Sequence, residues 1–222
     1  DRGAAVIGLD LSPAIVEAFS GRAWLGIEAD VTDADQVSAS VAAAVERFGG
    51  VDILIAAAGV FGANAPIAHL DLEEWARTLR VNLDGVVITM RQVHPLLALA
   101  PRGGRVVLIG SKNVRAPGRG AAAYSASKAA VTQLARVAAL EWAADGITVN
   151  TLHPDGVFDT GLWSNELIAQ RAASYGMTAA EYRQRNLLGR SITSADVGRI
   201  AADLCGPGFS AVTGAQIPID GG

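Results

Sequence analysis

The sequence predicts an α/β fold in which helices cover both faces of a doubly wound, mostly parallel sheet. Short apolar runs alternate with longer helical patterns along the whole chain, as in repeated βαβ units. Half of the 222 residues are hydrophobic and only 18% are charged, a balance that suits buried strands beneath closely packed helices. At this length we expect one domain, residues 1–222, with a full-sized core.

Six short apolar runs are expected to form the strands of this sheet. In chain order they are residues 4–9, 23–28, 53–57, 105–109, 148–152 and 216–219. Helical patterns fill the gaps between them, as parallel pairing requires, because a parallel connection has to cross the sheet.

Capping residues mark the ends of the first helices. Ser12 followed by Pro13 supplies an N-cap and a first-turn proline. Thr32 is expected to cap a helix that runs to Phe48, where the glycine pair at 49–50 stops it.

The later helical patterns are longer. They cover residues 71–91 and 121–144, and the last helix is expected to open at Ser194 or Thr193. Within residues 161–190, one or two helices form an excursion outside the βα alternation. Such a late excursion commonly covers a substrate, so we expect these residues to be a cover.

The beginning of the chain matches the middle of such a fold. The stretch "DRGAAVIGLD" resembles the end of a helix, a glycine stop at Gly3 and a strand that ends in Asp10. In a doubly wound dinucleotide-binding fold, the glycine-rich phosphate turn follows the first strand, and an acidic residue at the tip of the second holds the adenosine ribose. We therefore expect an N-terminally truncated domain without that first strand and turn. Residues 4–9 and 53–57 would then each leave a backbone edge unpaired.

Asp10 has two readings. It is expected to hold a ribose, although a carboxylate here could also start a turn or help to cap the segment at Pro13. Because Leu11 follows it instead of an arginine, the ribose reading favours NAD over NADP, whose phosphate a carboxylate would repel.

Composition excludes several classes of function. The net charge of −4, with no basic cluster, gives no basis for binding nucleic acid or an anionic membrane. Cys205 is the only cysteine, which excludes an internal disulfide and favours a reducing, cytoplasmic location. No apolar run reaches the ~18 residues of a membrane span, and no cluster of histidines and carboxylates suggests a metal. A small molecule is the expected partner.

Tyr124 and Lys128 stand out in the helical stretch "AAAYSASKAAV". The chain has three tyrosines and two lysines, and a spacing of four residues puts this pair on one face of a helix. A phenol has a pKa of about 10, and an ammonium within about 4 to 6 Å lowers it by about 1 to 3 units. Tyr124 is therefore a candidate general acid and base.

Ser111 is the third candidate. It follows the strand at 105–109, thirteen residues before Tyr124, so a loop can bring its hydroxyl over the start of the helix. There it could hold a carbonyl oxygen beside the phenol. A hydrolase nucleophile would need the pattern G-x-S-x-G, which "LIGSKN" lacks.

Together these residues resemble the short-chain dehydrogenase/reductase family. The resemblance rests on Ser111, Tyr124 and Lys128, on Asn82 in "WARTLRVNLDG", on "EADVTD" around Asp30 and on the closing "TGAQIPIDGG". It covers nearly the whole chain. It implies a Rossmann-type domain that binds NAD or NADP and moves a hydride between the nicotinamide and a carbonyl or hydroxyl carbon. Members of the family often form dimers or tetramers.

The resemblance also implies roles for individual residues. Tyr124 exchanges the proton, Lys128 lowers its pKa and contacts the nicotinamide ribose, Ser111 orients the substrate oxygen and Asn82 supports a water relay through a kinked helix. Asp30 is expected to contact the adenine, with helix capping as the alternative. The remaining expected cofactor contacts are Val31, Ala57, Gly59, Pro154, Val157 and Thr160.

Two stretches depart from the family pattern. The family usually has Asn-Asn-Ala-Gly where this chain has "AAAG" at residues 56–59, so amide side chains that steady this loop are missing. In "HPDGVFDTGLW", Asp155 occupies the usual glycine place and one extra residue precedes Thr160. Val157 remains the expected carboxamide contact.

Three further residues have open interpretations. His153 enters the loop beside the expected nicotinamide site and either packs there or contacts the substrate. Lys112 follows Ser111 and is either solvated or binds an anionic substrate group. His69 and His94 are expected to lie in loops or to pack against neighbouring side chains, without a role in the site.

Some stretches are more specifically similar to the dehydrogenase half of bifunctional rhamnulose-phosphate aldolase/short-chain dehydrogenases. They are "GSKNVRAPGRGAAAYSASKAA", "HPDGVFDTGLW" and "YGMTAAEYRQRNLLG". This similarity implies a fused N-terminal aldolase domain and a small hydroxyaldehyde such as lactaldehyde as substrate. The alternative is a non-catalytic relative that uses the fold for binding or assembly, because a fold alone does not determine function.

Overall fold

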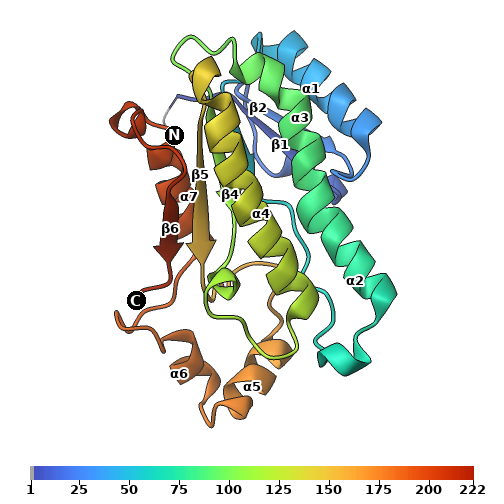
Figure 1. Ribbon diagram of the computed structural model, residues 1–222, viewed down its shortest axis with the longest axis vertical. Helices are drawn as coiled ribbons and strands as arrows, with labels where there is room; N and C mark the ends of the chain where they lie inside the picture. Colours follow the sequence, from blue (N-terminus) through green and yellow to red (C-terminus); the bar gives the residue numbers. More distant parts are fainter. Residues whose placement is uncertain (1–2) are drawn as a thin grey trace.

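The computed structural model describes residues 3–222, in which parallel strands alternate with helices as predicted (Figure 1). The strands are β1 (Val6–Asp10), β2 (Trp24–Glu28), β3 (Ile53–Ala56), β4 (Arg105–Ile109), β5 (Thr148–Pro154) and β6 (Gln216–Ile219). All six predicted strands are confirmed, with ends that differ by two residues at most. The predicted helix end at residues 1–2 lies outside the described residues.

Seven α-helices occur in the described residues. They are α1 (Ala34–Phe48), α2 (Leu72–Leu79), α3 (Gly85–Leu97), α4 (Ala122–Glu141), α5 (Asn165–Ser174), α6 (Ala179–Arg183) and α7 (Ser194–Leu204). In this part of the chain, no helix is both long enough and apolar enough to cross a membrane.

The strands form two separate parallel sheets. One has the order β3-β4-β5-β6, and the other consists of β1 and β2. Within the described residues no ladder joins β1 to β3, so each keeps one unpaired edge, as the sequence predicted. Val6 of β1 is 47% exposed, and Ile53 and Ile55 of β3 are 40% and 45% exposed, whereas β4 and β5 are buried almost throughout.

Helices cover both faces of the four-stranded sheet. On one face, α3 and α4 pack through Leu97 and Ala135 against Val106 and Leu108 of β4. On the other face, α7 packs against Val107, the β4 residue between them. Successive strand residues point to opposite faces, so a strand buried on both sides has to be continuously apolar. This explains the "RVVLI" run of β4.

The predicted cap of α1 was wrong by one residue. Asp33, not Thr32, is the N-cap, and its carboxylate accepts hydrogen bonds from the N–H groups of Asp35 and Gln36. The Thr32 N–H instead donates to Asp30 in the preceding turn, at 2.8 Å. The helix ends at Phe48 as predicted, because Gly49 takes the left-handed conformation with φ of 88°.

The other predicted helix starts are confirmed. Ser12 caps a 3₁₀ turn, Pro13–Glu17, and Thr193 opens α7 through a reciprocal capping box with Asp196. The pattern at 71–91 is interrupted by one π-helical turn, Arg80–Asp84, between α2 and α3. This irregular turn contains Asn82, where the resemblance implied a kink, and α3 runs on to Leu97, past the predicted end at Arg91.

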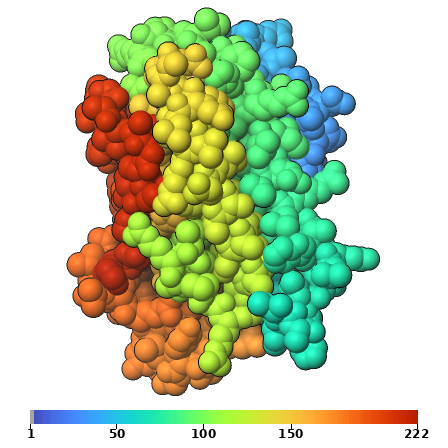
Figure 2. Space-filling model, viewed as in Figure 1, coloured from blue at the N-terminus to red at the C-terminus, as the bar shows by residue number. Residues whose placement is uncertain are grey.

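The excursion at 161–190 forms the two helices α5 and α6. In Figure 1 the arrows of β5 and β6 point toward these helices, so the excursion lies beyond the carboxyl ends of the strands. It has a small core of its own, in which Ile168 and Ala172 of α5 meet Tyr182 of α6. In the space-filling view of Figure 2 it lies at the base of the molecule, beneath α4 and the segment after β4.

Candidate active site

The predicted catalytic residues come together beyond the carboxyl end of β4. Ser111 directly follows this strand, Tyr124 and Lys128 lie in the first turns of α4, and Asn82 lies in the π-helical turn. Asn82, Ser111 and Lys128 are 0%, 7% and 5% exposed. Three segments that are distant in sequence thus supply one buried polar group, which was the expectation from the sequence.

Ser111 is held beside the phenol. The Ser111 side chain interacts with the phenol of Tyr124 and lowers its pKa, although less than burial raises it. The Ser111 hydroxyl oxygen also accepts from the Asn113 N–H at 3.2 Å, which caps a 3₁₀ turn, Lys112–Val114. Both oxygens are therefore positioned to meet one substrate oxygen.

Burial controls the protonation of this pair. The sequence predicted that Lys128 lowers the pKa of Tyr124, but burial is the largest influence and raises the pKa of the phenol. Burial also lowers the pKa of Lys128 to about 8. The reason is desolvation, which disfavours the charged form of each group. The Lys128 ammonium lies 5.8 Å from the centre of the Tyr124 ring and donates to the carbonyl oxygen of Ile109 at 2.8 Å.

This burial makes stability depend on pH. The pKa of Lys128 is about 8 in the folded chain, below its ordinary value of 10.5, so the unfolded chain binds more protons between these values. The cost of burying the ammonium is fully present below pH 8, and the free energy of unfolding should rise by about 3 kcal/mol as pH increases through this window. The raised pKa of Tyr124 acts in the opposite direction, but only near pH 10 and above.

Lys128→Met should abolish this rise. The measurement is urea unfolding of the wild-type chain and the variant at a series of pH values from 7 to 10. Lys112→Met, which removes the other lysine, serves as the matched control and should keep the wild-type slope. A rise of the same size in Lys128→Met would show that another group produces it.

Asn82 clamps the loop that follows β3. Its side-chain oxygen accepts from the Val60 N–H at 2.7 Å, and its amide nitrogen donates to the Val60 carbonyl at 2.9 Å and to the Ser127 hydroxyl at 3.0 Å. This restrains the loop in which "AAAG" replaces the usual amides. The side chain is thus engaged with protein groups, and the water relay stays a prediction.

Gly59 allows the same loop to approach Lys128. A Cβ at Gly59 would lie 3.2 Å from the Asn82 side-chain oxygen and 3.5 Å from the Lys128 ammonium. The backbone therefore leaves a narrow cradle at this point, which suits the close approach of a flat ring or a ribose.

Two residues of the site were not predicted. The Phe61 ring packs against the Tyr124 ring, with centres 4.5 Å apart, and contributes to its burial. Arg171 of α5 lies over the other side of the site, 5.5 Å from the Phe61 ring centre, and donates to the Asn64 side chain at 2.9 Å. Arg171 thus fastens the cover to the loop after β3. The only sequence signal for Phe61 was its place shortly after the carboxyl end of a predicted strand, β3.

The expected adenosine contacts lie at the ends of β1 and β2. Asp10 is exposed, and one of its carboxylate oxygens accepts from the Ser12 N–H at 2.8 Å, so the turn reading is present. Asp30 likewise accepts from Thr32, and Val31 packs against the backbone at Gly85. Ala57 is exposed at the end of β3. The second carboxylate oxygen of Asp10 remains available to a ribose.

Some of the residues after β5 that are expected to contact the cofactor also contact other residues of the protein. Val157 packs into the core beside α7 and pairs with Ile192, and the Thr160 hydroxyl donates to the Val157 carbonyl at 3.0 Å. Pro154 ends the strand. His153 is only 3% exposed, and its Nδ1 lies 2.9 Å from the Ser111 carbonyl oxygen, which favours the packing reading.

The other histidines are remote from this site. His69 lies in a 3₁₀ turn, Ile67–His69, and His94 of α3 contacts Asp145 at 2.9 Å. Within the described residues, no group of three or more histidine, cysteine or acidic side chains could hold a metal ion.

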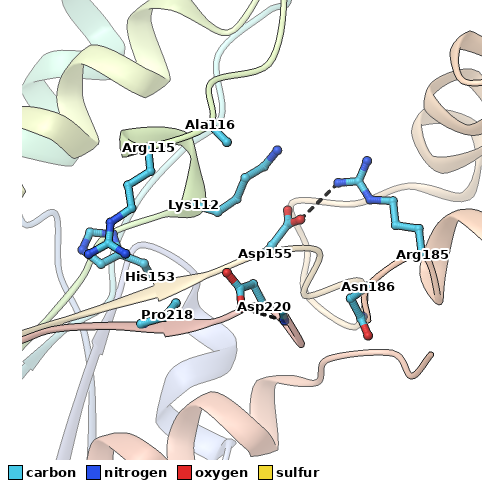
Figure 3. A pocket seen from close by; sticks show the side chains of 10 residues that line it. Lys112, Arg115, Ala116, His153, Asp155, Arg185, Asn186, Pro218 and Asp220 are labelled. Atoms are coloured by element: carbon cyan, nitrogen blue, oxygen red, sulfur yellow. Dashed lines mark hydrogen bonds and ion pairs between the residues drawn. The ribbon is translucent and has the colours of Figure 1, made fainter. Parts of the chain in front are cut away.

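Two hollows lie near this site. The larger, about 500 Å³, is lined by Phe61 of the loop after β3, whose ring packs on Tyr124, and by Leu167 of α5. The smaller, about 300 Å³, lies on the side of Lys112 and Asp155 (Figure 3).

Comparison with known proteins agrees with this geometry. The family model described as enoyl-(acyl carrier protein) reductase matches residues 1–222. Cis-4-hydroxycyclohexanecarboxylate dehydrogenase of Sinomonas cyclohexanicum is 34% identical over 228 residues, which cover 100% of this chain and 87% of the relative. The uncharacterized oxidoreductase YuxG of Bacillus subtilis is 33% identical over 207 residues, 91% of this chain. The chain spans only 30% of the length of YuxG.

Solved structures show the same fold. Sorbitol-6-phosphate 2-dehydrogenase SrlD of Erwinia amylovora superposes with a TM-score of 0.88 at 27% identity, over 99% of this chain and 90% of that one. The 3-ketoacyl-(acyl-carrier-protein) reductase of Brucella melitensis, complexed with NADH, gives a TM-score of 0.87 at 29% identity, over 99% and 88% of the two chains.

Proposed function

This chain belongs to the short-chain dehydrogenase/reductase family, and we propose that it is an NAD-dependent oxidoreductase acting on a small hydroxy or carbonyl substrate. The observation that carries the proposal is the group of the buried Ser111 and Lys128 with the half-buried Tyr124, in which a hydroxyl, an ammonium and a phenol lie together. A group of this kind provides a proton at one oxygen and a fixed position for the substrate.

Each residue of the group has a distinct task. The nicotinamide, when bound, supplies or accepts the hydride. Ser111 holds the substrate oxygen, and Tyr124 gives it a proton during reduction or takes one during oxidation. Because burial raises the pKa of Tyr124, the phenol is protonated at neutral pH and acts as the acid of the reductive direction. Lys128 ties α4 to the end of β4 through Ile109.

The residues present fit a dinucleotide at the carboxyl ends of the strands. Asp10 would hold the adenosine ribose, and Gly59 and Lys128 would flank the nicotinamide ribose at the narrow cradle described above. The other residues proposed to contact the cofactor are Asp30 and Val31 at the adenine, Ala57 after β3, and Pro154, Val157 and Thr160 after β5.

We propose NAD rather than NADP because a free carboxylate oxygen of Asp10 can accept from a ribose hydroxyl but repels a phosphate. Asp10→Ala should therefore narrow the preference for NAD by about tenfold, the effect of one hydrogen bond to a charged group. The measurement compares kcat/KM for NAD and NADP in the two proteins. Ser12→Ala is the control, because it alters the same turn without removing the carboxylate. If Asp10→Ala kept the wild-type ratio of kcat/KM for NAD and NADP, Asp10 would only stabilise the turn and would have no part in the choice of cofactor.

For the substrate we propose a small hydroxyaldehyde such as lactaldehyde, and for the full-length protein a fused aldolase domain. The support is the specific similarity of three stretches described above, together with a match to YuxG that covers 30% of that relative. A panel of small hydroxyaldehydes and alcohols with NAD, read out by the absorbance of reduced nicotinamide, tests the substrate.

We also propose a cytoplasmic homodimer or homotetramer. The outer face of α4 exposes Leu140 by 81% and Val137 by 40%, and an exposed apolar helix face of this kind suits an interface between copies. Sedimentation of the chain, compared with Leu140→Glu, tests the assembly.

A further inference from the structure

We infer that the smaller hollow beside Ser111 binds an anionic group, a phosphate or a carboxylate, that is carried by the substrate. This inference rests on the proposed oxidoreductase function, but it names an anionic hydroxy or carbonyl compound as the substrate in place of the neutral lactaldehyde. The hollow adjoins the catalytic serine in two ways. Lys112 on its wall is the next residue in the chain, and the buried His153 both lines the hollow and contacts the Ser111 backbone.

Three cationic side chains from different segments line the hollow. Lys112 and Arg115 come from the segment after β4, and Arg185 comes from the segment after α6. In Figure 3 the side chains of Lys112 and Arg185 extend into the same open space. Within the part of the chain that the structure describes, neither Lys112 nor Arg115 forms an ion pair. Both keep their N–H donors for a ligand.

Arg185 is held in place without a ligand. Its guanidinium donates to the Asp155 carboxylate at 3.1 Å, and its central carbon lies 4.5 Å from the Tyr182 ring centre and 5.5 Å from that of Tyr175. The planar guanidinium has five N–H donors, so a pairing with one carboxylate oxygen leaves donors for an anion. Because the side chain is already ordered, little conformational entropy is lost on binding.

The hollow also contains two carboxylates, Asp155 and Asp220. Asp155 is paired with Arg185, and one oxygen of Asp220 accepts from the Gly222 N–H at 3.0 Å. The side chains that line the hollow thus comprise three cations and two carboxylates, and one of these carboxylates is already paired with a cation. Carboxylates accept hydrogen bonds from hydroxyl groups, so the lining suits a hydroxylated carbon chain that ends in an anion.

The hollow is linked to the reacting oxygens through His153, which lines it and lies 2.9 Å from the Ser111 carbonyl oxygen. The Asp155 carboxylate on its wall is close enough to Tyr124 to raise the pKa of the phenol. A ligand whose anionic end meets Lys112 and Arg185 would have to extend past His153, which contacts the Ser111 backbone, to present another carbon to Ser111 and Tyr124. Asp155, which stands where the family usually has glycine, has a role in this arrangement. Its carboxylate holds Arg185 at the wall of the hollow.

Matched substrates test the inference. The probes are xylitol, its terminal phosphate ester and the corresponding aldonic acid, which share a carbon skeleton and differ in charge. We expect kcat/KM to be at least about tenfold higher for one of the charged probes than for xylitol. Lys112→Gln and Arg115→Gln should each lower this ratio by about tenfold, as expected for one charge-assisted hydrogen bond. Arg119→Gln, in the same loop but outside the hollow, is the control and should keep the ratio.

A preference for the phosphate ester identifies a phosphate site, and a preference for the aldonic acid identifies a carboxylate site. Equal kcat/KM for all three probes, or a ratio that both variants leave unchanged, overturns the inference. Calorimetric titration with inorganic phosphate separates the inference from the proposed function. If no probe reduces NAD but Lys112→Gln still weakens phosphate binding at least about fivefold, the function fails and the anion site stands. Equal phosphate binding by wild type, Lys112→Gln and Arg115→Gln overturns the site even in an active enzyme.

Discussion

Tyr124→Phe should lower the turnover number by about 100-fold or more, the scale of a lost general acid and base, while NAD binds nearly as tightly as before. The substitution removes only the phenol oxygen of Tyr124. The Phe61 ring still packs on the substituted ring and Lys128 still bonds to Ile109, so the surroundings keep their structure. Only the group that exchanges the proton is removed. The measurements are steady-state kinetics and calorimetric titration of NAD.

Tyr182→Phe is the matched control. It removes a hydroxyl from a ring that is 3% exposed and lies in the cover, outside the Ser111–Tyr124 pair. This variant should keep most of the turnover. If Tyr124→Phe also kept most of its turnover, Tyr124 would have no part in proton transfer.

The second large effect is on stability and NAD binding, and it follows from the gap between the two sheets. β1 and β3 each keep an unpaired edge, and Val6, Ile53 and Ile55 expose apolar surface there. Without a strand between them, these edges lose their ladder hydrogen bonds and the apolar burial that a central strand would supply, whereas a whole domain is stable by only about 5 to 15 kcal/mol. We therefore expect the 222-residue chain alone to be unstable or aggregated and to bind NAD weakly, so the kinetic, unfolding, titration and sedimentation measurements of the variants require a chain extended at its N-terminus.

A chain extended at its N-terminus by one βα unit, roughly 25 to 35 residues with an apolar strand and a glycine-rich turn, should recover both properties. The experiment compares urea unfolding and calorimetric NAD titration of the two chains. A flexible extension of the same length, rich in glycine and serine, is the control and should recover neither. Cooperative unfolding and tight NAD binding by the 222-residue chain would contradict the prediction.

The strands and most helix ends could be read from the sequence because they depend on local physics. A short, continuously apolar run such as "RVVLI" is stable mainly as a buried strand. Gly49 ends a helix because glycine readily takes the left-handed conformation. The cap of α1 could not be decided between Thr32 and Asp33, because both side chains accept hydrogen bonds. Asp33 is the cap because Thr32 is drawn into the turn made by Asp30.

The composition of the site was predictable, but its electrostatics were not. The spacing of Tyr124 and Lys128 correctly predicted that they share a helix face beside Ser111. Their pKa values depend on burial, to which Phe61 contributes from a distant loop, and no local pattern reports it. The pairing of Asp155 with Arg185 joins residues thirty positions apart and likewise required the fold.

The most direct test of hydride transfer follows the hydrogen itself. A small alcohol that the enzyme oxidises is supplied with deuterium on its hydroxyl-bearing carbon, together with NAD, and the reduced cofactor is examined by mass spectrometry. The proposed function predicts that the deuterium is recovered on the nicotinamide and that Tyr124→Phe yields about 100-fold less of it in the same time. Binding of NAD without any transfer of deuterium, across the whole panel of alcohols and hydroxyaldehydes, would contradict it and would indicate a domain that binds the cofactor without catalysis.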